Sequence, residues 1–186
     1  MSFIFTPCPI PDLYEIQPKI FGDRRGYFFE SYSQRDFYAT GFTLPFVQDN
    51  HSMSCKGTLR GLHFQITHPQ GKLIQVIRGE VFDVAVDIRP DSPTKGKWHG
   101  VILDSEKQKQ FYIPPGFAHG FLALSEQVIF AYKCTDFYYP EDEGGIIWND
   151  PDIGIKWPDL GFEYILSDKD KKLPSFSSLL TGGKKQ

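Results

Sequence analysis

The sequence predicts an all-β protein, either an antiparallel sandwich or a jelly-roll barrel. Short segments with strand-like apolar spacing recur about every ten residues, and turns rich in glycine and proline separate them. Only one segment has a convincing helical pattern. The chain has 186 residues, of which 40% are hydrophobic and 16% aromatic, so it can bury a large core as one domain.

Charge and cysteine content exclude several classes of protein. A net charge of −3 gives no general attraction to nucleic acid or to an anionic membrane, so a local cluster of arginine and lysine would have to hold an anionic ligand. Cys8, Cys55 and Cys134 are odd in number and lack metal-ligand spacing, which indicates a reducing compartment. No basic n-region opens the chain, and no apolar run approaches the roughly 18 residues of a membrane span. We expect a cytoplasmic protein without nucleic-acid or membrane partners.

The first third of the chain contains strands and one helix. Residues 13–21 have the apolar spacing of a strand, in which Pro18 predicts an edge position or a bulge. The stretch GDRRGYFFES opens on a Gly-Asp turn and continues as an aromatic strand. Residues 33–41 form the clearest helix, because Ser33 can cap its first turn and Gly41 can end it.

The strand GTLRGLHFQ, residues 57–65, carries the first candidate site residues. Side chains alternate between the two faces of a regular strand, so Arg60 and His63 would point in opposite directions. Gly61 between them is typical of a bulge or of close approach by a ligand, and a bulge could turn both side chains toward one pocket. The alternative is a partly exposed strand with a hydrogen-bonded histidine.

Two features beside this strand bear on the site. Gln48, Asp49 and Asn50, just before it, form either a turn or a polar stretch that reads the amide and hydroxyl edges of a ligand. Residues 71–89, just after it, predict a β-hairpin whose two β-branched runs meet near Gly79.

Charged residues interrupt this apolar hairpin. Asp83 and Asp87 share one face of its second run, and we expect them to face solvent or to pair with one another. Lys72 opens the first run and is a candidate pocket cation.

The second half of the chain adds more strands and then irregular loops. A short strand at 101–103 is followed by aromatic strands on both sides of a Pro-Pro-Gly turn within 110–124. Another strand covers 128–134. Residues 148–159 are too rich in proline, glycine and aspartate for regular structure.

The C-terminal part predicts a short helix and a tail. Residues 166–176 can start a short helix, capped by Ser167 and stopped by Pro174, and the final TGGKKQ is expected to fray. We therefore expect one domain over residues 1–186, with its core at about 10–165 and a C-terminal extension at 166–186.

Several common catalytic motifs are missing from the sequence. There is no phosphate loop, no dinucleotide fingerprint and no nucleophile-elbow serine. The histidines include no pair at i+2 or i+4, and His63 is followed by Phe64 and Gln65 rather than by another imidazole. Three protein ligands are the minimum for a catalytic metal, and the sequence does not assemble them. We expect no metal site.

Longer stretches of the chain carry a family pattern. They are, in order, GDRRGYFFES, FVQDNHS, LRGLHFQ, GKLIQVIRGEVFDVAVDIR, SPTKGKWHG, IPPGFAHGFLALS, YKCTDFYYPEDEG and WNDPDIGIKWP. Together they resemble the dTDP-4-dehydrorhamnose 3,5-epimerase family from about residue 22 to 158, with a weaker similarity in LSDKDKKLP. The resemblance implies a cupin-type jelly-roll homodimer that uses neither a metal nor a redox cofactor.

The activity implied by the resemblance is an isomerisation of a sugar nucleotide. The family inverts C3 and C5 of dTDP-4-dehydro-6-deoxy-D-glucose to give dTDP-4-dehydro-L-rhamnose, a step in making dTDP-L-rhamnose. The C4 ketone acidifies the C–H bonds at C3 and C5, so proton removal gives an enolate and reprotonation from the opposite face inverts the centre. The alternatives are an epimerase that inverts only C3 or only C5, and a non-catalytic barrel that binds a sugar nucleotide.

The resemblance also assigns catalytic roles. His63 matches the base, Tyr132 the acid on the opposite face of the sugar, and Lys72 the cation near the enolate oxygen. Asp170 matches the carboxylate that orients His63, but its spacing from Ser167 also suits a capping box, so a helix cap is the alternative. For Tyr132 the alternative is a core tyrosine on an apolar strand.

The remaining matches are to substrate-binding residues. Arg25 and Arg60 match cations beside the diphosphate, and the neighbouring Arg24 leaves open which arginine of that pair makes the contact. Tyr138 matches the ring that stacks on thymine. The other matches are Glu30, Gln48, Asp49, Asn50, His119, Glu143 and Lys169. In the family, strand exchange brings some of these residues across a dimer interface, so we expect dimerisation to matter for activity.

Overall fold

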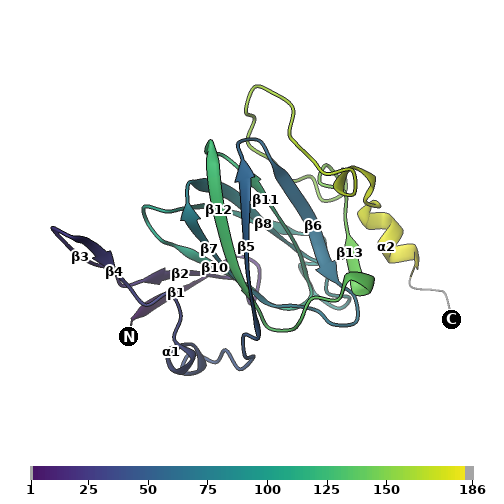
Figure 1. Cartoon of the computed structure of the whole chain (residues 1–186). Coiled ribbons are helices and arrows are strands. Elements are labelled where there is room, and N and C mark those ends of the chain that lie inside the picture. Colours follow the sequence, from purple (N-terminus) through teal and green to yellow (C-terminus); the bar gives the residue numbers. More distant parts are fainter. Residues whose placement is uncertain (1, 183–186) are drawn as a thin grey trace.

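Two antiparallel sheets face each other across an apolar core in the computed structural model, which describes residues 2–182 (Figure 1). The first sheet has the strand order β1-β2-β10-β7-β12-β5. Its strands are β1 (Phe3–Pro7), β2 (Tyr14–Pro18), β5 (Gln48–Cys55), β7 (Lys72–Arg78), β10 (Gln110–Ile113) and β12 (Gln127–Cys134). The all-β prediction is confirmed.

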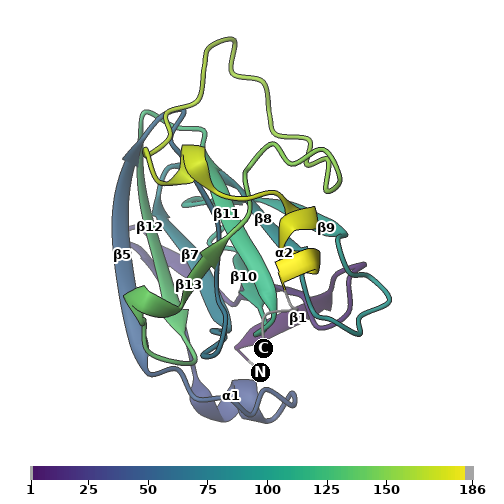
Figure 2. The same ribbon diagram turned by 90° about the vertical axis from the view of Figure 1, so that its right-hand side faces the viewer.

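The second sheet closes the other side of the barrel, as the rotated view shows (Figure 2). Its strand order is β13-β6-β11-β8-β9. Its strands are β6 (Leu59–Gln65), β8 (Glu80–Asp87), β9 (Trp98–Asp104), β11 (Phe117–Ala123) and β13 (Glu143–Gly145). Neighbours within each sheet are mostly distant in sequence, which is typical of a jelly roll.

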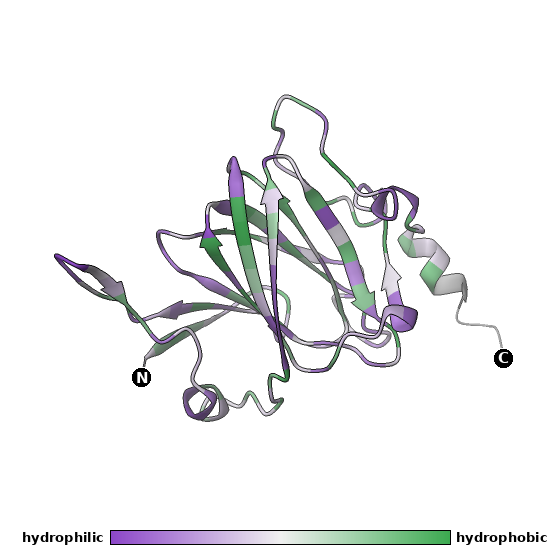
Figure 3. Cartoon of the chain, viewed as in Figure 1, coloured by the Kyte–Doolittle hydropathy of each residue, from purple (hydrophilic) through white to green (hydrophobic). Residues whose placement is uncertain are grey.

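The core lies between the two sheets. Phe111 and Phe130 from the first sheet and Leu103 and Val81 from the second are almost fully buried there. Each such side chain contributes about 1.5–3 kcal/mol on burial. The hydropathy colouring shows apolar and polar residues along β6 (Figure 3), whose Leu62 and Phe64 pack in a second apolar cluster with Ile146 and Phe176.

The predicted hairpin at residues 71–89 is wrong, although both of its strands exist. β7 pairs with β10 and β12 in the first sheet, whereas β8 pairs with β11 and β9 in the second. The chain therefore crosses between sheets at Gly79, whose φ is +82°. A Cβ at this position would lie 2.6 Å from the Gln127 carbonyl oxygen, so the corner requires glycine.

The two aspartates of β8 are also placed differently from the prediction. Asp83 and Asp87 are fully buried, and neither faces solvent or pairs with the other. Asp83 contacts His119, and Asp87 accepts hydrogen bonds from Arg89 and Ser92. Buried carboxylates need such partners, and local sequence does not reveal them.

An N-terminal hairpin, β3 (Phe21–Asp23) and β4 (Gly26–Phe28), extends away from the barrel on the left of Figure 1. Its turn lies at Arg24 and Arg25, two residues beyond the predicted Gly-Asp turn. Phe21, Tyr27 and Phe28 are 51%, 60% and 68% exposed, so the hairpin presents an aromatic surface.

The strand and helix that flank this hairpin follow the sequence only in part. Pro18 ends β2, which lies between β1 and β10, so the expected edge position is wrong within this chain. The predicted helix appears as α1 (Gln34–Tyr38), and Ser33 Oγ accepts a hydrogen bond from the Asp36 amide at 3.4 Å.

The C-terminal helix prediction is right in position but not in length or type. The expected short helix between Ser167 and Pro174 is reduced to one 3-10 turn, η2 (Asp170–Lys172), where Ser167 Oγ accepts from the Asp170 amide. A helix the sequence did not predict, α2 (Phe176–Gly182), follows Pro174. A second 3-10 turn, η1 (Pro140–Asp142), precedes β13. The predicted frayed tail covers residues 181–186, of which 181 and 182 end α2 and those from 183 on lie outside the described residues. Among residues 2–182 no helix is long and apolar enough to cross a membrane.

Candidate active site

A bulge in β6, where it pairs with β11, determines the direction in which the first site residues point. His63 lies opposite His119, but Arg60 lies opposite Phe121, so β6 has one extra residue between these two pairs. Gly61 occupies the bulge with φ +117°, and a Cβ there would lie only 2.6 Å from the Gly120 Cα. The bulge predicted from Gly61 is confirmed, and it directs Arg60 and His63 to one cavity.

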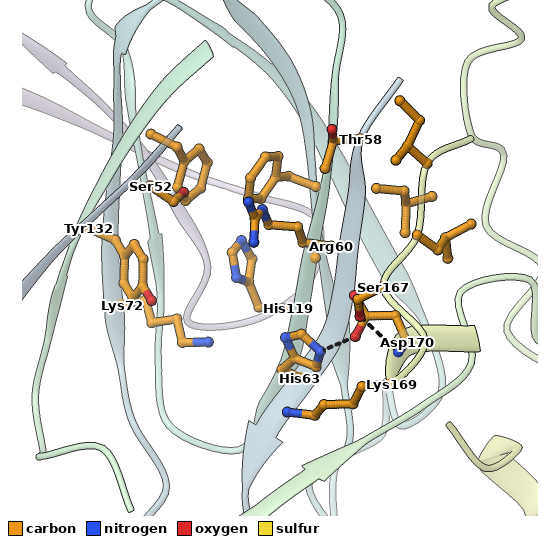
Figure 4. Close-up of a pocket in the computed structure, with 16 residues that line it drawn as sticks. Ser52, Thr58, Arg60, His63, Lys72, His119, Tyr132, Ser167, Lys169 and Asp170 are labelled. Atoms are coloured by element: carbon orange, nitrogen blue, oxygen red, sulfur yellow. Dashed lines mark hydrogen bonds and ion pairs between the residues drawn. The ribbon is translucent and has the colours of Figure 1, made fainter. Parts of the chain in front are cut away.

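This cavity has a volume of about 520 Å³ and opens between the two sheets (Figure 4). Strands of both sheets line it, and the segment of residues 165–170 closes one side. The residues predicted to be catalytic or substrate-binding that line it are Arg60, His63, Lys72, His119, Tyr132, Lys169 and Asp170. The fold therefore brings together side chains that are more than one hundred residues apart in sequence.

His63 and Asp170 form a short polar contact in the cavity. His63 Nε2 lies 2.7 Å from Asp170 Oδ1, and the Asp170 side chain is only 5% exposed. Burial alone would raise the pKa of Asp170, but hydrogen bonds from His63, Ser167 and the Gly61 amide hold it below its usual value. The carboxylate is therefore ionised and can only accept a hydrogen bond.

This contact fixes the tautomer of the neutral imidazole. Because the ionised Asp170 accepts from Nε2–H, the lone pair of neutral His63 lies on Nδ1. Asp170 also begins η2, where its backbone N–H donates to Ser167 Oγ at 3.1 Å. The two interpretations of Asp170 from the sequence are thus both visible, since its amide is capped while its carboxylate contacts the histidine.

Glu143 lies on the other side of the imidazole. Its Oε1 is 4.0 Å from His63 Nδ1, while its Oε2 is 2.5 Å from Lys169 Nζ and accepts from the Tyr138 hydroxyl at 2.7 Å. Burial would raise the pKa of Glu143, but Lys169, Tyr138 and His63 together hold it below its ordinary value. The bond to Glu143 in turn raises the pKa of Tyr138 to about 12.

Tyr132 and Lys72 lie across the cavity from His63 (Figure 4). They come from the neighbouring strands β12 and β7, which pair in register at Tyr132 and Ile74. Burial raises the pKa of Tyr132, so its hydroxyl remains protonated at neutral pH. Burial lowers the pKa of Lys72, against the opposing effects of Cys134, Asp83 and Glu143.

Sequence reasoning missed one buried residue of the site. Asp83 lies beneath the cavity, and its Oδ1 and Oδ2 are 3.1 Å and 3.0 Å from His119 Nε2. Burial lowers the pKa of His119, although Asp83 acts in the opposite direction. The signal that could have identified Asp83 is its position as a carboxylate inside an otherwise apolar run, VFDVAV.

The predicted nucleoside contacts divide between two faces of β5. Gln48 Nε2 donates to Asn50 Oδ1 at 3.0 Å, and Gln48 Oε1 accepts from the Tyr138 amide at 3.0 Å, so these three residues lie together. Asp49 points the other way and pairs with Lys133 at 2.9 Å. Since residues 48–50 form part of a strand, the alternative prediction of a turn is wrong.

Seven predicted substrate contacts do not line this cavity: Arg25, Glu30, Gln48, Asp49, Asn50, Tyr138 and Glu143. Of these, Arg25 and Glu30 lie on or next to the N-terminal hairpin. Arg25 is on the N-terminal hairpin, where it pairs with Asp23 at 2.6 Å and its side chain is 84% exposed. Glu30 follows the same hairpin and is also exposed. Within one chain, neither residue is brought to the cavity that His63 lines.

Comparison with known proteins gives a consistent picture. The sequence model of the family described as dTDP-4-dehydrorhamnose 3,5-epimerase matches residues 7–178. A dTDP-4-dehydrorhamnose 3,5-epimerase of Methanothermobacter thermautotrophicus is 55% identical over 171 residues, covering 91% of this chain and 92% of that protein. That relative is thus matched over almost its full length.

Solved structures agree in fold as well as in sequence. The crystal structure of dTDP-6-deoxy-D-glucose-3,5-epimerase from Legionella pneumophila in complex with dTDP-4-keto-L-rhamnose is 52% identical, with a TM-score of 0.92 over 94% of this chain and 93% of that one. A 3'-monoepimerase from Streptomyces bikiniensis in complex with dTDP-quinovose is 35% identical, with a TM-score of 0.89 over 95% and 90% of the two chains. This chain, a cupin-type jelly roll, therefore belongs to the dTDP-4-dehydrorhamnose 3,5-epimerase family.

Proposed function

We propose that this protein is an isomerase that inverts C3 and C5 of dTDP-4-dehydro-6-deoxy-D-glucose, giving dTDP-4-dehydro-L-rhamnose for dTDP-L-rhamnose biosynthesis. The observation that carries the proposal is the position of His63, which contacts Asp170 at 2.7 Å and faces Tyr132 and Lys72 across the cavity. A base on one side and a proton donor on the other are what inversion of a carbon acid requires.

In the proposed mechanism His63 removes the proton from carbon. Its Nδ1 accepts the proton from C3 or C5 of the sugar, and Asp170 stabilises the imidazolium that results. Lys72 donates a hydrogen bond to the C4 oxygen as negative charge develops there. Tyr132, protonated at neutral pH because of its raised pKa, delivers a proton to the opposite face of the ring.

Each of these parts accounts for a fraction of the barrier. General acid–base catalysis of about 10²–10⁴ corresponds to roughly 3–5 kcal/mol. One preorganised donor at the enolate oxygen adds roughly 3–4 kcal/mol. Proton transfer to and from carbon leaves the oxidation state of the sugar unchanged, so the proposed reaction calls for no redox cofactor. No metal takes part in it.

The residues around the cavity suit a nucleotide sugar. Arg60 and Lys169 supply positive charge at the cavity, as a diphosphate requires. Gln48, Asn50 and Tyr138 form a connected polar group that suits the thymidine end. Tyr138 is 48% exposed, which leaves one face of its ring open to stack on a base. In this proposal His119 and Glu143 contact the sugar, and Asp49 the nucleoside.

We infer that the active protein is a homodimer. The N-terminal hairpin extends from the barrel with three large aromatic residues exposed, and it carries Arg25 and Glu30 away from the cavity of its own chain. A second copy would cover the aromatic surface and receive these two residues at its nucleotide site. Arg25, or its neighbour Arg24, would then contact the diphosphate of the partner's substrate.

A mixing experiment tests the shared site. His63→Asn and Arg25→Ala are each expected to be inactive as homodimers, but heterodimers formed by refolding them together would contain one site without either change. Recovery of part of the wild-type activity on mixing is the expected result. Mixtures that stay inactive, although native mass spectrometry shows heterodimers, would contradict a site built from two chains.

The reaction itself is tested by hydrogen exchange. The protein is incubated with the 4-keto sugar nucleotide in heavy water, and mass spectrometry with proton NMR counts the exchanged positions. Exchange at both C3 and C5, with dTDP-L-rhamnose formed on coupling to a reductase, is expected. Exchange at one carbon alone would identify a single-centre epimerase, an activity that the similar 3'-monoepimerase makes a real alternative. Bound substrate without exchange would leave a non-catalytic binding barrel.

Two further proposals concern the chain as a whole. We propose one domain over residues 1–186, because Phe176 of α2 packs on Leu62 and Ile146 of the barrel and thereby joins the C-terminal extension to it. We also propose a cytoplasmic location, which the free cysteines Cys8, Cys55 and Cys134 support.

A further inference from the structure

Three potential metal ligands from distant parts of the chain meet outside the catalytic cavity. Cys8 follows β1, Glu15 lies on β2, and His99 lies on β9 of the opposite sheet. The thiol sulfur, one carboxylate oxygen and one ring nitrogen all lie within 4.8 Å of one another. All three residues are half-buried, and the lining of the catalytic cavity does not include them.

The ring of His99 gives a second, independent observation. Its Nε2 is buried, and within the described chain it has no hydrogen-bond partner. The nearest carboxylate oxygen, Glu15 Oε1, is 3.9 Å away, beyond hydrogen-bond distance. Buried polar atoms are nearly always satisfied, so this nitrogen is the kind of atom that a bound ligand would satisfy.

We propose that Cys8, Glu15 and His99 form a binding site for a divalent cation of the zinc class, separate from the catalytic cavity. Thiolate, imidazole and carboxylate are the ligand types that zinc takes, and three protein ligands leave a fourth position for water. In a tetrahedral site the sulfur and nitrogen ligands lie about 3.6 Å apart, given bonds of about 2.3 and 2.1 Å. The three donor atoms therefore need to approach by about 1 Å, within the reach of side-chain rotation.

Lys109 is the competing cation at this site. Its Nζ lies 2.5 Å from Glu15 Oε2, while Oε1 of the same carboxylate faces His99. The Lys109 side chain is one-third exposed and can turn toward solvent. Its charge opposes a bound dication, so Lys109→Gln should tighten metal binding by at least about tenfold.

Metal binding at neutral pH requires the loss of one proton from Cys8. Burial, followed by the Glu15 charge, raises the pKa of the Cys8 thiol to about 11, against the weaker effect of Lys109. The balanced step is therefore Cys8–SH plus M²⁺ giving Cys8–S⁻–M²⁺ plus H⁺. Burial also lowers the pKa of His99, which keeps the imidazole neutral and able to coordinate. Affinity should rise with pH.

A bound ion at this position would connect the two sheets. Glu15 pairs with Thr6 of β1 and Phe111 of β10 in the first sheet, while His99 pairs with Ala85 of β8 in the second. The ion would hold the N-terminal strands to the edge strand β9. Because the unfolded chain lacks the assembled site, zinc should raise the melting temperature.

Cobalt titration of the metal-free protein tests the proposal. Cobalt bound by a thiolate in a tetrahedral site gives a near-ultraviolet charge-transfer band together with visible ligand-field bands. We expect one equivalent to saturate both in the wild type and Cys8→Ser to abolish the charge-transfer band. His99→Asn and Glu15→Gln should weaken binding. Cys55 is exposed, so Cys55→Ser provides the matched control, and its charge-transfer band should be unchanged.

Two results would overturn the site. One is a wild-type protein without the charge-transfer band, and the other is a band that disappears with Cys55 or Cys134 rather than with Cys8. X-ray absorption of zinc-loaded wild-type protein gives an answer that does not depend on any variant folding. One sulfur and at least one imidazole around zinc are expected, and a shell without sulfur would contradict the proposal.

Discussion

Replacing Asp170 with asparagine tests the proposed base most directly. The substitution keeps the size of the side chain but removes the charge that accepts from His63 Nε2 at 2.7 Å. An amide at this position can instead donate to Nε2, which favours the tautomer with its proton on Nδ1. That tautomer presents no lone pair to the substrate, so His63 could not act as the base.

The expected loss follows from the burial of the pair. The Asp170 side chain is 5% exposed and that of His63 is 29% exposed, so solvent screens their contact weakly. A hydrogen bond to a charged group contributes about 1.5–3 kcal/mol, which corresponds to roughly 10–150-fold in rate. Adding the unfavourable tautomer, we expect kcat to fall by about 10²–10⁴-fold, with KM changed by less than about threefold.

The assay couples product formation to the reductase and compares steady-state parameters with those of a matched control. Asp168→Asn removes the same charge two residues away, where the side chain is 92% exposed and 3.8 Å from Lys171. Its kcat should stay within about twofold of the wild-type value. A folded Asp170→Asn protein with kcat within about threefold of wild type would refute the argument, as would equal losses in both variants.

Three further predictions follow from the same structure. Tyr132→Phe should slow product formation by at least about 10²-fold while exchange of substrate hydrogens with heavy water continues, and NMR showing wild-type product formation would contradict the acid role. Asp87 has a pKa of about 2, since hydrogen bonds led by that from Arg89 outweigh its burial. The folded pKa of Asp87 lies below its unfolded value. Above pH ~5 the carboxylate therefore adds about 2 kcal/mol to the free energy of unfolding, and this contribution is lost as the pH falls toward ~2. Urea unfolding of Asp87→Asn should show that acid-dependent loss reduced, and an unchanged profile would argue against it. Gly61→Ala should lower the free energy of unfolding by at least about 1–2 kcal/mol, because φ at this residue is +117° and the new Cβ would meet Gly120. Thermal unfolding measures the change. A melting temperature equal to that of the wild type would contradict the tight bulge.

Local sequence identified the strands of this barrel better than their partners. Alternating and β-branched runs mark β7 and β8, and Gly79 marks the turn between them, but the same pattern suits a hairpin and a crossing between sheets. What decides between them is pairing with β10, β12, β9 and β11, whose residues lie elsewhere in the chain. Helix α2 was missed for a related reason, since Phe176 packs on Leu62 and Ile146 rather than on its own neighbours.

Local sequence also predicted only some of the contacts in the site. Gly61 between Arg60 and His63 predicted the bulge because a strand glycine has a local physical meaning. Asp170 and Tyr132 were assigned roles beside His63 only through the family resemblance, since no spacing rule links residue 63 to residue 170. Asp83 stands out in sequence as a carboxylate in an apolar run, but its contact with His119 could not be predicted, because the two residues meet only when β8 and β11 pair.

In the proposed reaction His63 takes up a proton and releases it before the next turnover, and two carboxylates lie beside its imidazole. The imidazole thus alternates between its neutral and protonated forms during the proposed reaction. Asp170 holds Nε2 in both forms. On the Nδ1 side Glu143 stays 4.0 Å away, and Lys169 and Tyr138 already bind its other oxygen. A free carboxylate hydrogen-bonded to Nδ1 would retain the proton and block the lone pair, whereas this shared charge stabilises the imidazolium and leaves Nδ1 open to the substrate.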